Sequence, residues 1–284
     1  MSVPPAFADI SKSANDLLNK DFYHLSAGTI EVKSNTPNNV AFKVTGKSSH
    51  EKATSGAIEG KYVDKSLGLT LTQVWNTANN LDTKIELADS VAKGLKAEGV
   101  FSFLPATQSK GAKLNLTFKQ SAFHGRAFFD LLKGPTANID AVIGHEGFLA
   151  GAQAGYDVQK AAVTSYSAAV GYVAPQYSAA ITASSNLSVF AASYYHKVNS
   201  QTEAGAKATW DSKASNAVGL EVASKYRLDP VSFAKAKIND RGVAAVSYNV
   251  LLRPGVTLGL GASFDTQKLD QATHKVGASF TFES

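Results

Sequence analysis

Residues 112–119, with the sequence AKLNLTFK, alternate between apolar and polar side chains at every position. The even-numbered residues are Ala, Leu, Leu and Phe, whereas the odd-numbered residues are Lys, Asn, Thr and Lys. Because successive side chains of a β-strand point to opposite faces, this stretch predicts a strand with one apolar and one polar face. A register shift of one residue would exchange the two faces completely, so the pattern strongly constrains the fold.

The same alternation recurs from Ser26 to the last residues of the chain. Further clear examples lie at residues 81–87, 203–210 and 275–282. Turn-forming residues separate the segments, which are about ten residues long, and about nineteen segments can be counted. No linker or change in composition divides the chain, so we expect a single domain over residues 1–284.

Alternation alone does not say which face of the sheet is concave. A soluble sandwich or small barrel buries its apolar face, whereas a membrane barrel turns that face to lipid. About nineteen strands that close on themselves enclose an interior too wide for side chains to fill, so charged residues there would be hydrated. Segments of about ten residues are long enough to cross a bilayer at a tilt, and soluble strands are usually shorter. The sequence therefore predicts an all-β transmembrane barrel of about nineteen strands.

Aromatic residues agree with this prediction because membrane barrels carry aromatic girdles at both interfaces. We expect seven of them at strand ends: Tyr62, Trp75, Tyr172, Tyr177, Trp210, Tyr226 and Tyr248. The mean hydropathy of −0.09 is also typical of strands whose apolar and polar residues average out.

The stretch from Ala6 to Lys20 differs from the rest of the chain because its apolar residues recur at helical spacing. Phe7, Ile10, Ala14, Leu17 and Leu18 would form one face of an amphipathic helix. Acidic residues are present and the first arginine is Arg126, which argues against a cleaved targeting sequence. We expect residues 1–24 to form a helical segment that is retained inside the pore, and residues 25–284 to form the barrel.

The polar face of the predicted barrel carries more cations than anions, and the whole chain has a net charge of +5. We expect the lumen to favour anions weakly, but no Lys/Arg-dense run indicates a nucleic-acid partner. The residues predicted to set selectivity and sense voltage are Lys12, Lys20, Lys61, Lys96, Lys113, Lys119, Arg126, Lys235 and Lys237.

Catalytic, metal and cofactor patterns were not found. The chain has no cysteine, and its six histidines show no i, i+4 pair, so metal-ligand spacing is absent. There is no G-x-S-x-G elbow, Walker A loop or complete dinucleotide fingerprint. We therefore expect neither an enzyme nor a bound cofactor.

Two motifs indicate a family. A series of residues fits the eukaryotic porin signature: Tyr226, Asp229, Pro230, Ser232, Ala236, Lys237, Ile238, Asn239, Asp240, Ala245, Val246 and Tyr248. The spacing of Lys275, Gly277, Phe280 and Phe282 resembles the sorting signal of mitochondrial β-barrel proteins. Over its full length the chain resembles the mitochondrial outer-membrane porins, the voltage-dependent anion channels, and is most similar to fungal members.

The resemblance implies an odd number of strands, with the first and last strands parallel, and a location in the mitochondrial outer membrane. It implies a voltage-gated channel for passive diffusion of small metabolites and ions such as nucleotides, phosphate and organic acids. Gly94-Leu95-Lys96 matches a family element linked to nucleotide contact, which makes Lys96 a candidate contact for ATP and ADP. Lys12 and Lys20, on the water-facing side of the predicted helix, are the other two candidates.

Expected partners are membrane lipid and sterol, the mitochondrial import and barrel-assembly machinery, and a second copy of the chain in a homo-oligomer. Two other functions remain open at this point. One is a soluble β-barrel carrier of a hydrophobic ligand, and the other is a membrane docking barrel without conductance.

Overall fold

The computed structural model describes residues 3–90, 92–132, 134, 136–214, 217–271 and 273–284. These residues form nineteen strands, one α-helix and three short 3₁₀ helices. The strands are β1 (Gly28–Asn35), β2 (Val40–Ser48), β3 (Thr54–Asp64), β4 (Leu69–Asn76), β5 (Leu81–Ala88), β6 (Leu95–Leu104), β7 (Ser109–Gln120), β8 (Phe123–Asp130), β9 (Thr136–His145), β10 (Phe148–Asp157), β11 (Ala162–Val173), β12 (Tyr177–Ser184), β13 (Val189–Lys197), β14 (Thr202–Asp211), β15 (Val218–Asp229), β16 (Ser232–Asn239), β17 (Val243–Arg253), β18 (Val256–Asp265) and β19 (Lys275–Glu283).

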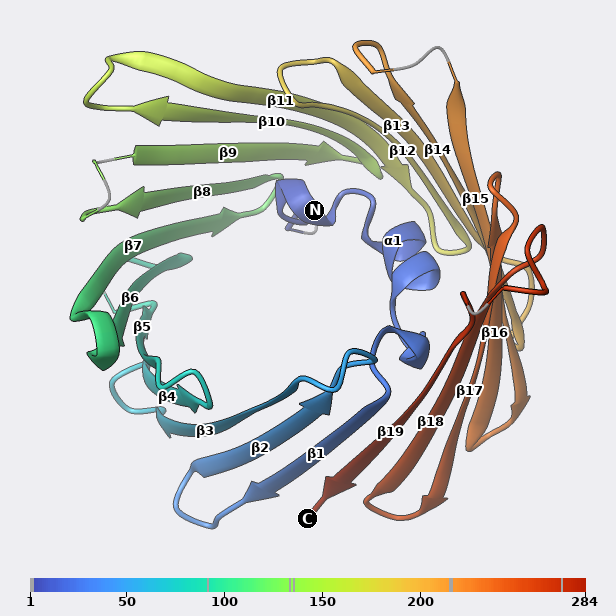
Figure 1. Cartoon of the computed structure of the whole chain (residues 1–284). Helices are drawn as coiled ribbons and strands as arrows, with labels where there is room; N and C mark the ends of the chain where they lie inside the picture. The colour runs from blue at the N-terminus through green and yellow to red at the C-terminus, as the bar shows by residue number, and fades with distance from the viewer. Residues whose placement is uncertain (1–2, 91, 133, 135, 215–216, 272) are drawn as a thin grey trace.

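The strands form one closed barrel (Figure 1). Each strand pairs antiparallel with the next along the chain, and β1 closes the barrel by pairing parallel with β19, as in the pairs of Gly28 with Ala278 and Lys33 with Glu283. The predicted strand count and the parallel closure implied by the resemblance are both confirmed. A salt bridge of 2.7 Å between Lys33 and Glu283 joins the two closing strands.

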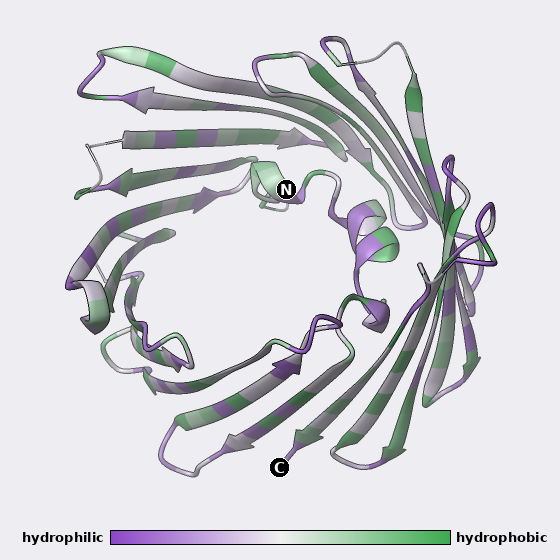
Figure 2. Ribbon diagram, in the orientation of Figure 1, coloured by the Kyte–Doolittle hydropathy of each residue, from purple (hydrophilic) through white to green (hydrophobic). Residues whose placement is uncertain are grey.

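Cross-strand partners lie on the same face of a sheet, so the register carries the polar face continuously around the barrel. Lys33, for example, pairs with Lys43, which pairs with Glu59. The apolar face points outward, where Ile58, Ile143 and Val170 are each more than half exposed. Figure 2 shows the resulting alternation of hydropathy along the strands. Such an outer surface suits contact with lipid rather than water.

The predicted aromatic girdle is confirmed in part. Tyr62, Trp75, Tyr172, Tyr177 and Trp210 lie within two residues of a strand end, and Tyr226 lies three residues from the end of β15. Tyr248 lies in the middle of β17, so the prediction that it marks a strand end was wrong. Period-two alternation fixes the face of a residue but not its height in the barrel.

The N-terminal segment lies inside the barrel against its wall, as predicted (Figure 1). It consists of the 3₁₀ turn η1 (Phe7–Asp9), the helix α1 (Lys12–Asn19) and the 3₁₀ turn η2 (Tyr23–Leu25). The third 3₁₀ turn, η3 (Pro105–Thr107), connects β6 to β7. No helix of the described residues is long and apolar enough to cross a membrane.

The expected continuous helix from Ala6 to Lys20 was wrong, because it breaks at Ile10 and Ser11. Ser11 has φ −101° and ψ 20°, outside the helical region. A straight helix over fifteen residues would be about 22 Å long and would leave the curved wall after a few turns. The break lets Ile10, which is 3% exposed, pack on β9 to β12 while Leu18, which is fully buried, packs on β15.

Small residues on the inner face make room for the segment. Glycines that touch it are Gly144, Gly151, Gly171, Gly205, Gly259, Gly261 and Gly277, which we call the glycine track. A β-carbon added at Gly205, for example, would lie 2.9 Å from Leu17. Glycine in a strand often marks such a close approach by another part of the chain.

Candidate functional site

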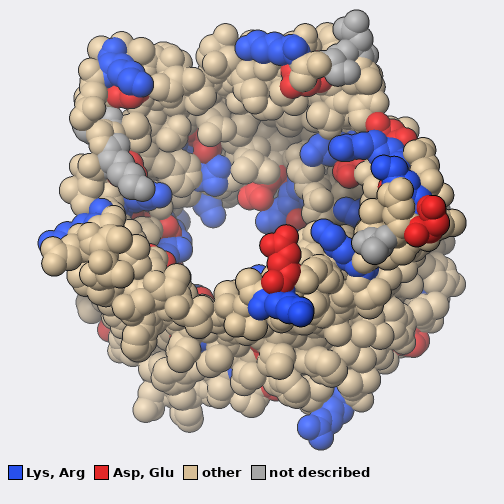
Figure 3. Space-filling view, viewed as in Figure 1, with Lys and Arg blue, Asp and Glu red and all other residues tan. Residues whose placement is uncertain are grey.

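An open passage runs through the barrel beside the N-terminal segment, and charged side chains line it (Figure 3). Two parts of the wall differ in chemistry. The strands β9 to β19 carry the glycine track and are covered by the segment, which contacts β9 and β10 through η1, β13 to β15 through α1, and β18 and β19 through η2. On the other side, β2, β3 and β5 to β8 present charged side chains to the passage, and we call β2 to β8 the charged wall.

On the charged wall, two lysines and two glutamates form a compact cluster. Lys84 lies 2.9 Å from Glu86 and 3.1 Å from Glu98, and Lys96 contacts Glu86 at 2.5 Å and Glu98 at 3.6 Å. All four side chains lie on β5 and β6 and are brought together by the pairing of Glu86 with Glu98. The predicted selectivity residue Lys96 therefore has its charge balanced by neighbouring carboxylates.

Arg126 is also paired. Its guanidinium donates three hydrogen bonds of 2.8–3.1 Å to the carboxylate of Asp140, whose side chain is only 2% exposed. The same guanidinium lies 5.1 Å above the Phe128 ring. Such a fork arrangement fixes the arginine in place, so it contributes a local dipole rather than a free positive charge.

Lys235 and Lys237 on β16 hold the end of α1. Lys235 donates hydrogen bonds to the carbonyl oxygens of Lys20 at 2.6 Å and Asp16 at 3.2 Å, and Lys237 donates to that of Leu18 at 2.9 Å. The carbonyls at the C-terminal end of a helix carry partial negative charge, so cations stabilise them, including that of Asp16, which also accepts the Lys20 amide at 3.0 Å. We call these two residues the lysine clamp. The prediction placed them on the lumen face correctly but did not identify this contact.

On the segment itself, Lys12 and Lys20 point toward the water of the lumen, and their side chains are 55% and 60% exposed. Each forms an ion pair, Lys12 with Asp9 at 3.3 Å and Lys20 with Asp16 at 2.7 Å. The hydrogen bond from Lys20 to Asp16 raises the pKa of Lys20 above its ordinary value. With Asp21, the segment carries two lysines and three aspartates.

The remaining predicted cations are less constrained. Among the described residues, Lys61, Lys113 and Lys119 make no ion pair within 4.0 Å. Lys61 lies on β3 and Lys113 on β7, two strands of the charged wall that face α1 across the passage (Figure 1). The three candidate nucleotide contacts are not brought together, because Lys96 on β6 lies across the lumen from Lys12 and Lys20.

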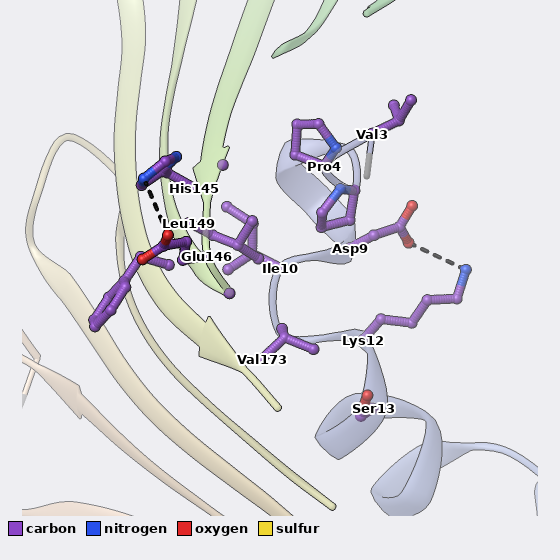
Figure 4. A pocket seen from close by; sticks show the side chains of 14 residues that line it. Val3, Pro4, Asp9, Ile10, Lys12, Ser13, His145, Glu146, Leu149 and Val173 are labelled. Atoms are coloured by element: carbon purple, nitrogen blue, oxygen red, sulfur yellow. Dashed lines mark ion pairs between the residues drawn. The ribbon is translucent and has the colours of Figure 1, made fainter. Parts of the chain in front are cut away.

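A cavity of about 660 Å³ lies at the N-terminal end of the segment, between it and the turn from β9 to β10 (Figure 4). Pro4, Ile10 and Leu149 form its apolar part. The Asp9–Lys12 ion pair borders it, as do the exposed side chains of His145 and Glu146, whose Nε2 and Oε1 atoms lie 3.8 Å apart. Because charges of both signs are present, the lining does not select one charge of ligand.

The predicted sorting residues lie on β19. Phe280 and Phe282 point outward with their rings 6.5 Å apart, whereas Lys275 and Gly277 face inward. Gly277 also belongs to the glycine track, so it has a packing role in the folded barrel. In the described part of the chain, no group of three or more His, Asp or Glu side chains could hold a metal ion.

Besides the lysine clamp, the sequence prediction missed other contacts of the segment. Lys207 donates a hydrogen bond of 3.2 Å to Asn15 of α1, and Tyr23 packs into a slot formed by Gly259, Gly261 and Gly277. A signal for the slot was present, because these glycines occupy lumen-facing positions of two consecutive strands. To interpret these glycines as a slot, one would have to know which strands lie next to the segment.

The geometry described so far, a nineteen-stranded barrel with a parallel seam and an internal N-terminal helix, agrees with the family comparison. The family model for eukaryotic porins matches residues 3–277. The chain belongs to the eukaryotic porin family. It is 82% identical over 280 residues to the mitochondrial outer membrane protein porin of Neurospora crassa, with 99% of each chain covered.

More distant relatives of this porin chain cover the same length. It is 53% identical to the mitochondrial outer membrane protein porin of Candida albicans, over 98% of this chain and 99% of that protein. It is 42% identical to non-selective voltage-gated ion channel 1 of Saccharomyces cerevisiae, over 99% of each. Among solved structures, a mutant of Rh. blastica porin aligns with a TM-score of 0.52 at 10% identity, over 84% of this chain and 98% of that one. That likeness concerns the barrel fold alone.

Proposed function

We propose that this porin is a voltage-gated channel of the mitochondrial outer membrane, through which small metabolites and ions diffuse passively. The observation that carries the proposal is the open, charge-lined passage inside a barrel whose outer surface is apolar. The names of its relatives, a mitochondrial outer membrane porin and a voltage-gated ion channel, support the location and the gating. No step of this function changes a transported molecule chemically.

We propose further that the channel favours anions weakly. Cations exceed anions over the chain by five charges, and Lys61, Lys113 and Lys119 lack the ion pairs that balance Lys96 and Arg126. Their field is screened over about 8 Å at physiological salt, so in a wide passage it biases ions without excluding either sign. Nucleotides, phosphate and organic acids are anions that such a passage would admit.

We also propose contacts with lipid, with other proteins and with nucleotides. The apolar outer surface would contact lipid and sterol, and could contact a second copy of the chain. The last strand, with Lys275, Gly277, Phe280 and Phe282 at the spacing of a sorting signal, would be recognised by the import and barrel-assembly machinery. ATP and ADP would contact Lys12 and Lys20 on the segment or Lys96 on the opposite wall, as separate sites.

The test of conductance is purified protein in a planar bilayer under a salt gradient. A channel gives large current steps with a small anion preference, which decrease at higher voltage. A docking barrel enters the bilayer without conducting, and a soluble carrier requires no detergent and does not conduct. Absence of current from protein that is folded by circular dichroism would contradict the proposal.

Selectivity is tested with two double variants that each remove two charged groups. Lys61→Gln with Lys113→Gln removes two unpaired positive charges and should shift the zero-current potential toward cation preference, less so at high salt. Glu86→Gln with Lys96→Gln removes one charge of each sign and should leave that potential unchanged. Equal shifts in the two variants would remove the unpaired lysines from the explanation of selectivity.

A further inference from the structure

The junction between α1 and the first strand is packed into the wall rather than free. The Tyr23 ring lies on the inner face of β18, where a β-carbon added at Gly259 would overlap it. At Gly261 such a carbon would lie 2.7 Å from the amide nitrogens of Tyr23 and His24, and at Gly277 it would overlap the carbonyl oxygens of Tyr23 and Ser26. Only glycine at these three positions lets the junction approach the wall this closely.

Hydrogen bonds hold the junction on both sides. The side-chain amide of Asn249 on β17 donates to the Tyr23 hydroxyl at 2.5 Å. The ring of His50, in the turn from β2 to β3, lies 2.7 Å from the carbonyl oxygen of His24, and the amide of Ala27 donates to Ser48 at 2.9 Å. The contacts come from β17 on one side of the β1–β19 seam and from β2 and its turn to β3 on the other, so the junction cannot shift along the wall without breaking several of them.

The low exposure of Phe22 and His24 also indicates that the junction is held against the wall. Phe22 is 4% exposed, with the ammonium groups of Lys235 and Lys237 at 4.9 and 4.8 Å from its ring centre. His24 is 7% exposed, whereas Leu25 beside it is 73% exposed. The backbone turns sharply just before this buried group, because Asp21 adopts the left-handed conformation with φ 61°.

The electric field acts only weakly on the segment as a whole. Its two lysines and three aspartates sum to a single negative charge, and each lysine is paired with an aspartate. The work done by the field is proportional to the net charge that moves, so displacing the whole segment would add little voltage dependence. The field therefore offers little force to pull the junction from its slot.

We propose that residues 22–26 are a fixed anchor, seated on Asn249, Gly259, Gly261 and Gly277, and that the anchor stays seated when the channel closes. The inference rests on the proposed voltage gating. If α1 moves during gating, its pivot is the bend at Lys20 and Asp21, in front of the anchor. Tyr23 and the three glycines are thus positioning residues, which hold the segment in the lumen without contacting the transported ion.

Thiol labelling tests the proposal. Because the chain contains no cysteine, one introduced cysteine provides the only thiol. His24→Cys places the thiol in the buried anchor, and Leu25→Cys places it at the exposed neighbouring position. Each channel is held open at low voltage and then closed at high voltage in a planar bilayer with a charged, water-soluble thiol reagent. Reaction is read as a change in current after the channel is returned to low voltage.

Leu25→Cys should react in both states, and His24→Cys should react at least tenfold more slowly in both. A His24→Cys thiol that reacts tenfold faster in closed channels than in open ones would overturn the proposal. If the parent channel conducts but never closes with voltage, the proposed gating fails. In that case, slow reaction of the His24→Cys thiol in the open channel would still show that the anchor is seated, and fast reaction would show that it is not.

Two variants in the His24→Cys background show that protection comes from the slot. Gly261→Ala should expose the thiol, whereas Gly219→Ala should not, because Gly219 also faces the lumen but a β-carbon there meets nothing closer than 3.7 Å. If Gly261→Ala does not insert as a folded barrel, Tyr23→Ala empties the slot without overlap and should expose the thiol likewise. Continued protection in Tyr23→Ala would refute the role of the slot.

Discussion

Replacing Lys235 with methionine is expected to release the C-terminal end of α1 from the wall. The Lys235 ammonium donates to the carbonyl oxygens of Lys20 and Asp16 and lies 3.8 Å from the Asp21 carboxylate. Its side chain is only 2% exposed. Methionine preserves much of the length and apolar contact of the lysine stem, so the change removes chiefly the ammonium and its hydrogen bonds.

The magnitude follows from those two bonds. A hydrogen bond involving a charged group contributes about 1.5–3 kcal/mol, and the freed carbonyls regain part of this from lumen water. A net loss of about 3 kcal/mol corresponds to about a 100-fold larger undocked fraction, because about 1.4 kcal/mol is a factor of ten. Lys237→Met removes one such bond, to Leu18, and should give about a tenfold increase.

The assay is the reaction rate of a single thiol at Ala14, which faces the wall and is 2% exposed. When undocking is fast compared with labelling, the rate is proportional to the undocked fraction. Lys113→Met is the matched control, because it removes the same charge from the opposite wall and should change the rate less than twofold. An increase below threefold for Lys235→Met, or an equal increase for Lys113→Met, would refute the clamp as the element that docks α1.

Labelling of the Ala14 thiol also tests the apolar face of α1. Leu18→Ala empties a fully buried position, which should cost about 2–5 kcal/mol of docking free energy and speed labelling at least 30-fold. Leu25→Ala, at an exposed position, should not change the labelling rate in this way. A second test uses pH. Burial, with the neighbouring Lys237 and Lys275 charges and His50, lowers the pKa of His24 below its usual value of 6.5, so the seated ring is neutral. The stability of the anchor is then fully present above about pH 6.5 and is lost as pH falls below it, because the unseated ring binds a proton more readily. A single thiol at Phe22, which is 4% exposed, should therefore be labelled faster at pH 5.5 than at pH 7.5 relative to a thiol at the exposed Leu25. His24→Gln should reduce that difference, and an equal difference in the variant would exclude His24.

The faces of the strands were predictable from the sequence because period-two alternation is a local property. Lys113 and Lys119 were assigned to the lumen from their positions in AKLNLTFK alone, and the register confirms both. The contacts of each charge were not predictable in the same way. Whether Lys96 is balanced depends on which residues of the neighbouring strand lie beside it, and the sequence alone does not give that register.

In the N-terminal segment, features that depend on distant parts of the chain were not predictable from the sequence. Helical spacing predicted which side chains of residues 6–20 pack on the wall, and Ile10, Leu17 and Leu18 are indeed buried. The break at Ser11 was not predictable, because it follows from the curvature of a wall that is distant in sequence. Lys235 also looked like an ordinary lumen charge, since nothing near it in the sequence indicates that α1 ends beside it.

The distribution of small and charged residues on the lumen face gives the barrel two functional sides. Glycines on β9 to β19 let the segment lie close to the wall, and the segment there presents lysines already paired with aspartates. The segment can therefore contribute little net charge to the passage. On the uncovered side, Lys61 and Lys113 remain unpaired among the described residues but stand beside a balanced cluster of lysines and glutamates. A few unpaired charges on one side of a wide, hydrated passage produce a weak bias rather than exclusion, and packing of the segment thus limits how selective the channel can be.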